Sequence, residues 1–241
     1  MRIITWNCNM AFRKKASIII SEKPDIIIVP ESESPEKLNF SQNDIIPNDM
    51  FWFGDNINKG IGVYSYSDFK ISLLKEHNPD FRFVIPLSIR NNDLDFILLA
   101  IWSQKPNHSD NYGLQTWNAL NFYDDLLQNK KVIISGDLNS SSIWDKPKRE
   151  ANHTNIVNHL NDKNIKSSYH LYFNEEQGKE KQSILHLHRK INRPYHIDFC
   201  FTSTYFTNRL QRVQIGTFEK WMKYSDHKPL IVDFDLSPLK H

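Results

Sequence analysis

The chain has 241 residues, of which 39% are hydrophobic and 24% are charged, which is the composition of a soluble globular protein. Thirty lysines and arginines against 28 aspartates and glutamates give a formal net charge of +2, which excludes a protein that coats nucleic acid through a general excess of positive charge. Any surface that binds phosphate must therefore be local. The length fits one domain with a sizeable core, and we predict a single domain over residues 1–241.

The N-terminal segment MRIITWNCNMAF carries one positive charge and an apolar run too short for a secretory signal. No stretch approaches the roughly 18 consecutive apolar residues of a membrane helix. We therefore expect a cytoplasmic protein without membrane insertion, and the sequence leaves its oligomeric state open. Cys8 and Cys200 lack the spacing of a disulfide framework or a zinc site, and we interpret both as reduced core residues.

Apolar runs alternate with polar segments through the first hundred residues. We predict a strand at 3–6, a helix at 11–22 and, after the break at Pro24, a buried strand at 25–29. Residues 60–74 and 82–102 are predicted to form antiparallel strands, the second stretch turning at Asn91 and Asn92.

The second half continues the alternation. Residues 112–128 carry an apolar stripe at helical spacing, which we interpret as core rather than as a cofactor pocket. A buried strand at 132–134, a helix at 155–160, a polar and basic segment at 178–195 and a strand at 196–201 follow, and a loop from 224 feeds a last strand. Strands repeated with helices outside them predict an α/β protein, a four-layer α/β sandwich.

Polar residues stand at the ends of several predicted strands. In KKVIISGDLNSSSIWD, a buried run ends in Asp137 and Asn139, which are two residues apart and so face the same side. Strand ends in α/β domains are common places for a functional site. The full set comprises Asn7, Asn9, Glu31, Asp137, Asn139, Asp198, Asp226 and His227. Any one of them alone is as well explained by a cap or a turn, whereas the whole set predicts a site.

This order of motifs resembles the endonuclease/exonuclease/phosphatase superfamily, which includes exonuclease III-like repair nucleases, DNase I, sphingomyelinases and inositol polyphosphate phosphatases. The resemblance covers nearly the whole chain, from WN through PES, GDLN and HID to SDHKP. GD-x-N and SDH-x-P in that order are specific, whereas WN alone is weak. The resemblance implies a DNase I-like fold of two packed, mainly antiparallel sheets flanked by helices, which agrees with the sandwich predicted above.

The resemblance also implies roles for these residues. A hard cation such as Mg²⁺, or Mn²⁺ in its place, prefers carboxylate oxygens and neutralises charge on a phosphate ester. Glu31 would bind it, with Asp226 and Asn9, although Asn9 stands where some relatives carry a carboxylate. Asp137 would orient or deprotonate the attacking water. The remaining implied catalytic residues are Asn139 as the water-holding amide, Asn7 as a support of the metal shell, His227 as the proton donor and Asp198 as its partner.

The chain departs from the family pattern in the middle. Family members usually place a Tyr or His there to reach the phosphate, whereas this sequence reads ILLAIWSQKPNHS. Trp102 would either stack on a substrate ring or fill the wall of the site. Tyr112, His108 or His196 would supply the missing donor, and His196 with Arg193 forms either a phosphate clamp or, for the histidine, part of the core. Trp144 lies in the loop after GDLN, where loops of the family touch substrate.

These observations favour a metal-dependent phosphodiesterase that acts as a nuclease on DNA or RNA. Four aromatic side chains could stack on bases, and the basic segment at 179–193 could contact phosphates. The alternative is that the aromatic side chains pack in the core and that the basic segment is a solvated loop. The aromatic residues are Trp102, Tyr112, Trp144 and Trp221. One alternative is an enzyme acting on a small phosphoester, namely an inositol phosphate, a nucleotide or a phospholipid headgroup. Another is a catalytically inactive phosphate-binding scaffold, which the retention of every proton-transfer residue argues against.

Overall fold

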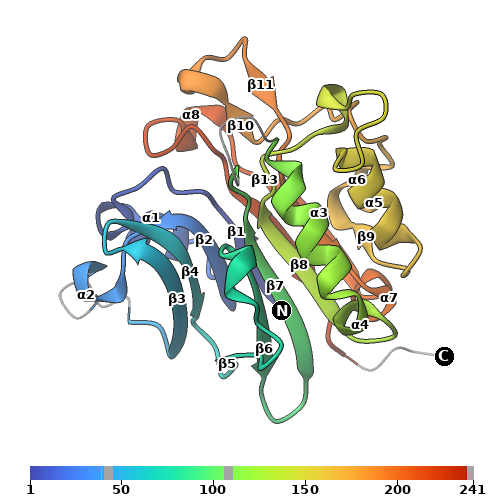
Figure 1. The fold of residues 1–241 in the computed structure, drawn as a ribbon. Coiled ribbons are helices and arrows are strands. Elements are labelled where there is room, and N and C mark those ends of the chain that lie inside the picture. The colour runs from blue at the N-terminus through green and yellow to red at the C-terminus, as the bar shows by residue number, and fades with distance from the viewer. Residues whose placement is uncertain (39, 41–45, 106–110, 238–241) are drawn as a thin grey trace.

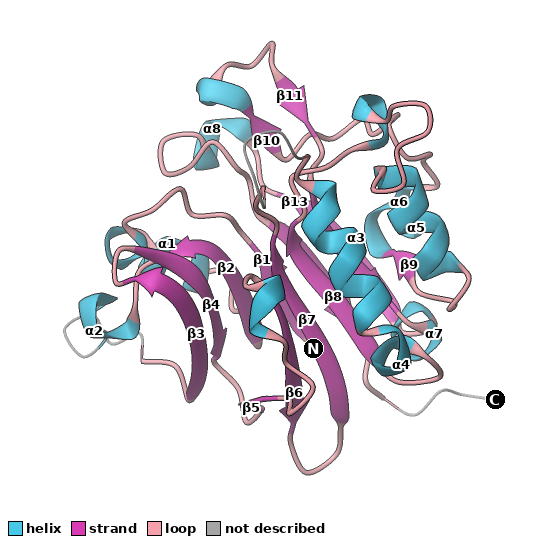
Figure 2. Ribbon diagram, viewed as in Figure 1, coloured by secondary structure: helices cyan, strands magenta, loops and turns pink. Residues whose placement is uncertain are grey.

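Two six-stranded sheets pack face to face, with helices on the outer face of each (Figures 1 and 2). The computed structural model describes residues 1–38, 40, 46–105 and 111–237. Within these residues the layer order is helices, sheet, sheet, helices, which confirms the predicted four-layer α/β sandwich.

The first sheet has the order β13-β14-β1-β2-β4-β3. Its strands are β1 (Arg2–Thr5), β2 (Ile26–Ser32), β3 (Asp49–Asn56), β4 (Lys59–Ser65), β13 (Leu210–Ile215) and β14 (Leu230–Phe234). Only β1 and β2 run parallel, and the other neighbours are antiparallel. Because the first and last strands of this sheet in chain order, β1 and β14, are neighbours, the WN and SDH segments leave the sheet close together.

The second sheet has the order β5-β6-β7-β8-β12-β9. Its strands are β5 (Lys70–Leu73), β6 (Val84–Arg90), β7 (Asp95–Trp102), β8 (Val132–Asp137), β9 (Lys166–Ser167) and β12 (Asp198–Thr202). The β7 and β8 strands are parallel, while β12 pairs antiparallel with β8 and places Asp198 opposite Asp137. A separate two-stranded hairpin, β10 (Leu185–His186) and β11 (Pro194–Tyr195), lies at the end of the sandwich where β7 and β8 end (Figure 1).

Three apolar clusters hold the layers together. The central cluster lies between the sheets and joins residues such as Ile28 of β2 to Leu98 of β7. A second packs α3 (Gly113–Phe122) and α5 (His153–Asn161) onto the second sheet, and a third packs α1 (Ala16–Ile20) and α8 (Phe218–Trp221) onto the first. Burial of these apolar surfaces is the main stabilising contribution. Cys8 and Cys200 are buried, free thiols in two of these clusters, as expected.

The remaining helices are short. They are α2 (Pro35–Leu38), α4 (Asp124–Leu127), α6 (Ser168–Phe173), α7 (Thr204–Thr207) and 3-10 turns at Phe12–Lys14, Pro79–Phe81, Ser142–Trp144 and Leu187–Arg189. No helix of the described residues is both long and apolar enough to cross a membrane.

Two predicted helices are shorter than expected. The helix predicted at 11–22 is wrong at its start, because Ala11 adopts a left-handed conformation with φ +50° and a 3-10 turn precedes α1. The helix predicted at 112–128 breaks at Tyr123, whose ψ of 17° separates α3 from α4. The apolar stripe remains core, as predicted, for Leu120, Tyr123 and Leu127.

The strands also differ in detail from the prediction. Residues 60–74 form β4 and β5, which lie in different sheets, and the strand predicted at 196–201 begins at Asp198. The hairpin at 82–102 is confirmed as β6 and β7. Strands β3 and β13 are missing from the prediction because both are edge strands whose side chains are largely exposed or half-buried, so neither shows a clear apolar alternation.

Candidate active site

Asp137 is the last residue of β8, and a glycine determines how the strand ends. Gly136 has φ +146°, and a Cβ atom there would lie 1.8 Å from the carbonyl oxygen of Ile101 on β7. Only glycine therefore lets β8 approach β7 this closely and still turn into the GDLN loop. Since Asp198 of β12 pairs with Asp137, two buried carboxylates stand side by side at this edge.

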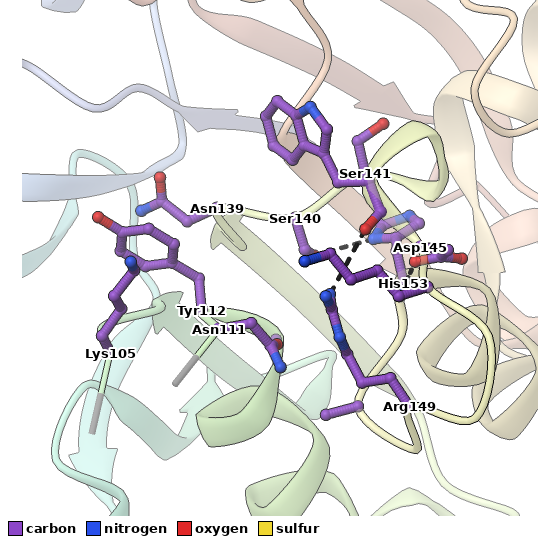
Figure 3. A pocket seen from close by; sticks show the side chains of 13 residues that line it. Lys105, Asn111, Tyr112, Asn139, Ser140, Ser141, Asp145, Arg149 and His153 are labelled. Atoms are coloured by element: carbon purple, nitrogen blue, oxygen red, sulfur yellow. Dashed lines mark hydrogen bonds between the residues drawn. The ribbon is translucent and has the colours of Figure 1, made fainter. Parts of the chain in front are cut away.

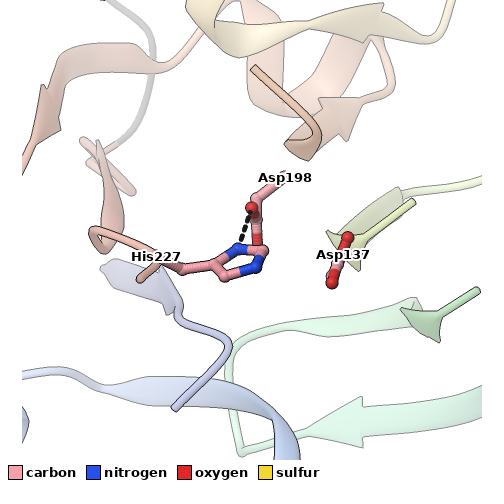
Figure 4. A group of neighbouring side chains, drawn as sticks. All are labelled: Asp137, Asp198 and His227. Atoms are coloured by element: carbon pink, nitrogen blue, oxygen red, sulfur yellow. Dashed lines mark hydrogen bonds and ion pairs between the residues drawn. The ribbon is translucent and has the colours of Figure 1, made fainter. Parts of the chain in front are cut away.

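His227 faces these carboxylates from the loop before β14 (Figure 4). Its Nδ1 donates to Asp198 Oδ2 at 2.7 Å, and both side chains are buried. The backbone of His227 is fixed on two sides, because its N–H donates to Ser225 Oγ and its carbonyl accepts from Trp6 Nε1 at 2.9 Å. The imidazole is thus held with its second nitrogen free of Asp198.

Two amides hold Asp137 in place. Asn7 Nδ2 donates to Asp137 Oδ2 at 3.0 Å, and Asn139 donates to the same carboxylate from its backbone N–H at 2.9 Å and from its side chain at 3.1 Å. Asn139 is in the left-handed region at φ +48°, which asparagine tolerates better than most residues. The side-chain nitrogen Nδ2 of Asn139 also donates to the backbone carbonyl of Ser103. These contacts bring together the segments that follow β1, β7 and β8.

Burial and charge tune the two titrating groups in opposite senses. Burial, reinforced by the charge of Asp198, raises the pKa of Asp137 to about 7. For His227, burial lowers the pKa, but the carboxylates of Asp198 and Asp137 outweigh it and raise the pKa to about 10. Between these values Asp137 is a free base and His227 a charged acid, which is the pair of states that general acid–base catalysis needs.

Glu31 reaches the same edge from β2 through an irregular backbone. It has φ +63°, and the register of β2 against β4 shifts between Pro30 and Ser32, so the residue sits in a bulge. Bulges redirect side chains next to functional sites. Glu31 Oε1 accepts from Asn7 Nδ2 at 3.3 Å, and its Oε2 lies 3.4 Å from Lys59 Nζ.

Asn9 and Asp226 form a linked pair beside Glu31 and Asn7. Asn9 Nδ2 donates to Asp226 Oδ1 at 2.7 Å, and the backbone N–H of Asn9 donates to Asn7 Oδ1. No described residue donates a hydrogen bond to the amide oxygen of Asn9 or to Asp226 Oδ2. Oxygen donors of this kind, together with Glu31, fit a hard divalent cation.

A second group of ligand atoms lies deeper in the site. Asp137, Asp198 and His227 each offer an atom within 4.8 Å of the others, so this buried cluster could also hold a metal ion. One of its oxygens, Asp198 Oδ1, is buried and has no hydrogen-bond partner among the described residues.

Three other predicted residues lie on segments next to the catalytic residues, and we call these three residues the rim. Tyr112 and Trp144 line a cavity with Asn139, and Arg193 is in the loop between β10 and β11, where Leu185 of β10 forms a bridge with His227. Trp144 and Tyr112 are 40% and 38% exposed, and Arg193 is exposed near the β10–β11 hairpin. Trp144 packs one side of its ring on Tyr195 at 5.0 Å between centroids. These side chains are therefore available to a ligand.

For three aromatic or histidine residues, Trp102, His196 and Trp221, the structure supports the alternative of wall or core packing over a substrate contact. Trp102 is 4% exposed and packs on Phe83 at 4.7 Å, so it fills the wall and offers no ring face to a base. His196 is buried against Tyr169 and its Nδ1 donates to the carbonyl of Gln182, so it is core rather than a phosphate clamp. Trp221 is buried on Trp6 in the outer cluster.

His108, the other candidate donor, lies outside the described residues.

Several basic residues near the site are absent from the sequence prediction. Lys59, the first residue of β4, contacts Glu31 and lies 4.8 Å from the centroid of the Trp102 ring, and no local motif marks it. Lys146 and Arg149 line a cavity with Asn139. For these two, the basic run KPKR a few residues after GDLN was the available signal.

Comparison with solved structures identifies the fold. An AP endonuclease from Archaeoglobus fulgidus matches with a TM-score of 0.74 and 17% identity over 98% of this chain and 100% of the other. The 3' phosphatase NExo from Neisseria, bound to a product DNA hairpin, matches with a TM-score of 0.73 and 17% identity over 98% and 99%. This chain has the DNase I-like fold.

The endonuclease domain of TRAS1, a telomere-specific non-LTR retrotransposon, has the DNase I-like fold too, with a TM-score of 0.66, 11% identity and coverage of 98% and 99%. No protein-family model matches the sequence, and no curated protein matches it either. In the DNase I-like fold of this chain, the motif residues from WN to SDHKP meet at one edge of the sandwich.

Proposed function

We propose that this protein is a divalent-metal-dependent phosphodiesterase, a nuclease that cleaves nucleic acid by in-line attack of an activated water. The observation that carries the proposal is the buried Asp198–His227 pair facing Asp137, with the pKa of one raised to about 7 and of the other to about 10. A purely structural cluster has no need for two charged groups without access to water.

Each catalytic residue has a role that follows from its contacts. Asp137 takes the proton of the attacking water, and Asn7 and Asn139 fix the direction of its carboxylate. As the bond from water to phosphorus forms and the bond to the leaving oxygen breaks, negative charge grows on the phosphoryl oxygens. His227, kept charged by Asp198, donates a hydrogen bond to one of them through the nitrogen that Asp198 does not use.

The cation is proposed to be Mg²⁺, with Mn²⁺ as a substitute. Glu31, Asn9 and Asp226 would hold it, because they supply oxygen donors beside Asn7 at the mouth of the buried pair. When bound, the cation would neutralise charge on the phosphate. Lys59 holds Glu31 Oε2 from the other side and so positions this carboxylate.

Nucleic acid is the proposed substrate. The structural neighbours include an AP endonuclease and a phosphatase bound to a DNA hairpin. The rim of this chain carries Tyr112, Trp144 and Arg193, which suit stacking and phosphate contacts. We also propose that the hydroxyl of Tyr112 supplies the phosphate hydrogen bond that the buried Trp102 does not.

A substrate panel tests the proposal. Purified protein is assayed with Mg²⁺, Mn²⁺ or chelator on single- and double-stranded DNA, abasic duplex, RNA, bis-p-nitrophenyl phosphate and inositol phosphates. We expect polynucleotide cleavage that needs the metal, is lost in Asp137→Ala and is kept in Asp93→Ala, a matched change at an exposed hairpin aspartate. Activity on small esters alone would replace the nuclease with a phosphatase. Inactivity on every substrate, with metal-independent phosphate binding, would indicate the scaffold.

A further inference from the structure

A cavity of about 450 Å³ adjoins the catalytic edge on the side of the GDLN loop (Figure 3). Its lining comes from the segments on either side of β8, the one before α3 and the one between GDLN and α5. Asn139, which holds Asp137, is also one of its wall residues. In Figure 3 Tyr112 and Asn139 lie at the same end of the cavity. Whatever occupies this space therefore lies next to Asn139 and close to Asp137.

The lining is positively charged although the protein as a whole is almost neutral. Among the described residues that line the cavity, Lys105, Lys146 and Arg149 contribute three cations and Asp145 contributes one carboxylate. That carboxylate is already engaged, because it accepts from the backbone N–H groups of His153 and Thr154 at the start of α5. The described part of the lining thus carries more positive than negative charge, which attracts a phosphate.

Aromatic rings give the cavity a second property. Trp144 and Tyr112 both line it and are 40% and 38% exposed, which is high for such large apolar side chains. Trp144 is steadied by Tyr195, and the ammonium of Lys105 lies 5.1 Å from the centroid of the Tyr112 ring. An inorganic phosphate would use the cations and leave these rings exposed, whereas a nucleotide would use both.

The walls are held in place before any ligand arrives. Ser140 Oγ hydrogen-bonds His153 Nδ1 at 2.9 Å, which ties the GDLN loop to α5. Arg149 Nη1 donates to the carbonyl of Trp144, and Asp145 anchors the same loop to the helix N-terminus. A pre-formed pocket loses little entropy on binding.

We propose that this cavity binds one unpaired nucleotide of the substrate strand, adjacent to the scissile phosphate. The base lies against Trp144 and Tyr112, and the phosphate of the same nucleotide lies on Lys146 and Arg149. A base inside the cavity cannot keep its pairing partner, so substrates with an unpaired nucleotide bind better than continuous duplex. This inference rests on the proposed nuclease function and specifies its substrate class.

Binding measured in chelator tests the pocket without chemistry. Fluorescence anisotropy gives Kd for two DNA duplexes of equal sequence, one fully paired and one with a single-nucleotide bulge. We expect wild type to favour the bulged duplex by at least about fivefold, the effect of one stacked base. Trp144→Ala and Arg149→Gln should each bring the ratio of the two Kd values close to one, with unchanged circular dichroism.

Matched controls lie outside the cavity. The controls are Tyr172→Ala and Arg212→Gln. Tyr172 is 45% exposed and lies beside α7, and Arg212 is exposed on β13. Both variants should keep the wild-type ratio of the two Kd values. If the wild-type protein cleaves DNA but binds the paired and the bulged duplex with equal Kd, the proposed nucleotide pocket is wrong and the proposed nuclease function is unaffected. A ratio retained in both cavity variants would overturn it as well. Failure of wild type to cleave any polynucleotide would overturn the proposed function itself.

Discussion

The centre and the rim of the site are built in different ways. The centre, Asp137, Asp198 and His227, is buried and fixed by strand pairing and hydrogen bonds. The rim, Tyr112, Trp144 and Arg193, stands on connecting segments and is exposed. Burial makes charge interactions strong in the centre and solvent makes them weak at the rim. We infer that the centre determines whether a phosphate ester is cleaved and that the rim determines which one.

The largest effect is expected at the centre. Asp137→Ala removes the proposed base and should lower kcat by about 10²- to 10⁴-fold, the usual contribution of a positioned acid or base. His227→Ala should lose activity to a similar degree, because the charged donor is gone. Both are measured as single-turnover rates on the best polynucleotide from the panel. A variant that keeps full activity would exclude that residue from the mechanism.

Breaking the buried pair should affect stability as well as rate. Asp198→Asn leaves His227 buried without its counter-charge, and we expect the free energy of unfolding at pH 7 to fall by about 3–5 kcal/mol. The pKa of His227 is raised above its ordinary 6.5 to about 10, so the stabilisation is complete below pH 6.5 and is lost as pH rises through about 10.

Urea unfolding of Asp198→Asn and wild type from pH 6 to 10.5 measures this difference. The two proteins should converge at the alkaline end. Asp68→Asn is the control, because within the described part of the chain the carboxylate of Asp68 accepts hydrogen bonds from the exposed side-chain amide of Asn91 and from no other residue. A difference that does not change with pH would mean that the aspartate stabilises the fold without charging His227.

The pH profile of kcat/KM should sharpen the assignment of base and acid. Activity should rise tenfold per unit up to about pH 7 as Asp137 loses its proton, and fall above about pH 10 as His227 loses its own. A bound cation moves both limbs to lower pH without changing their order. In Asp198→Asn the alkaline limb should also move down, and an unmoved limb would contradict the role of His227.

The smallest effect is expected at the rim. Arg193 is exposed, so Arg193→Gln should raise KM for DNA only a few-fold at moderate salt and leave kcat unchanged. The slope of log affinity against log salt should become shallower by about one. Anisotropy titrations from 50 to 300 mM salt measure it, with Arg212→Gln as the matched change away from the site. An unchanged slope would place Arg193 outside the substrate path.

The centre could be predicted from sequence because it depends on strand ends. A buried run that stops at Asp137 and Asn139 indicates where both side chains emerge, and the two-residue spacing indicates that they face together. In the structure, Asp137 accepts hydrogen bonds from both Asn139 and Asn7. The layer architecture was predictable for the same reason, since the buried strands have uninterrupted apolar runs.

The rest depends on long-range packing that local patterns do not contain. Trp102 and His196 follow apolar strand patterns, yet only the fold shows that Phe83 and Tyr169 cover them. The bulge that directs Glu31 is a mismatch between β2 and β4, which no single strand reveals. Lys59 is an ordinary hairpin lysine until β4 places it beside Glu31.

The contacts of Asn7 have a consequence for how the protein folds. Asn7 is hydrogen-bonded to Asp137, 130 positions later in the chain, and through its carbonyl to Ser225, 218 positions later. Contacts between such distant segments form slowly, because long loops must close first. The catalytic edge is thus completed only when the two ends of the chain have joined as β1 and β14. After dilution from denaturant, activity should therefore return with the final, global phase of folding and not before it.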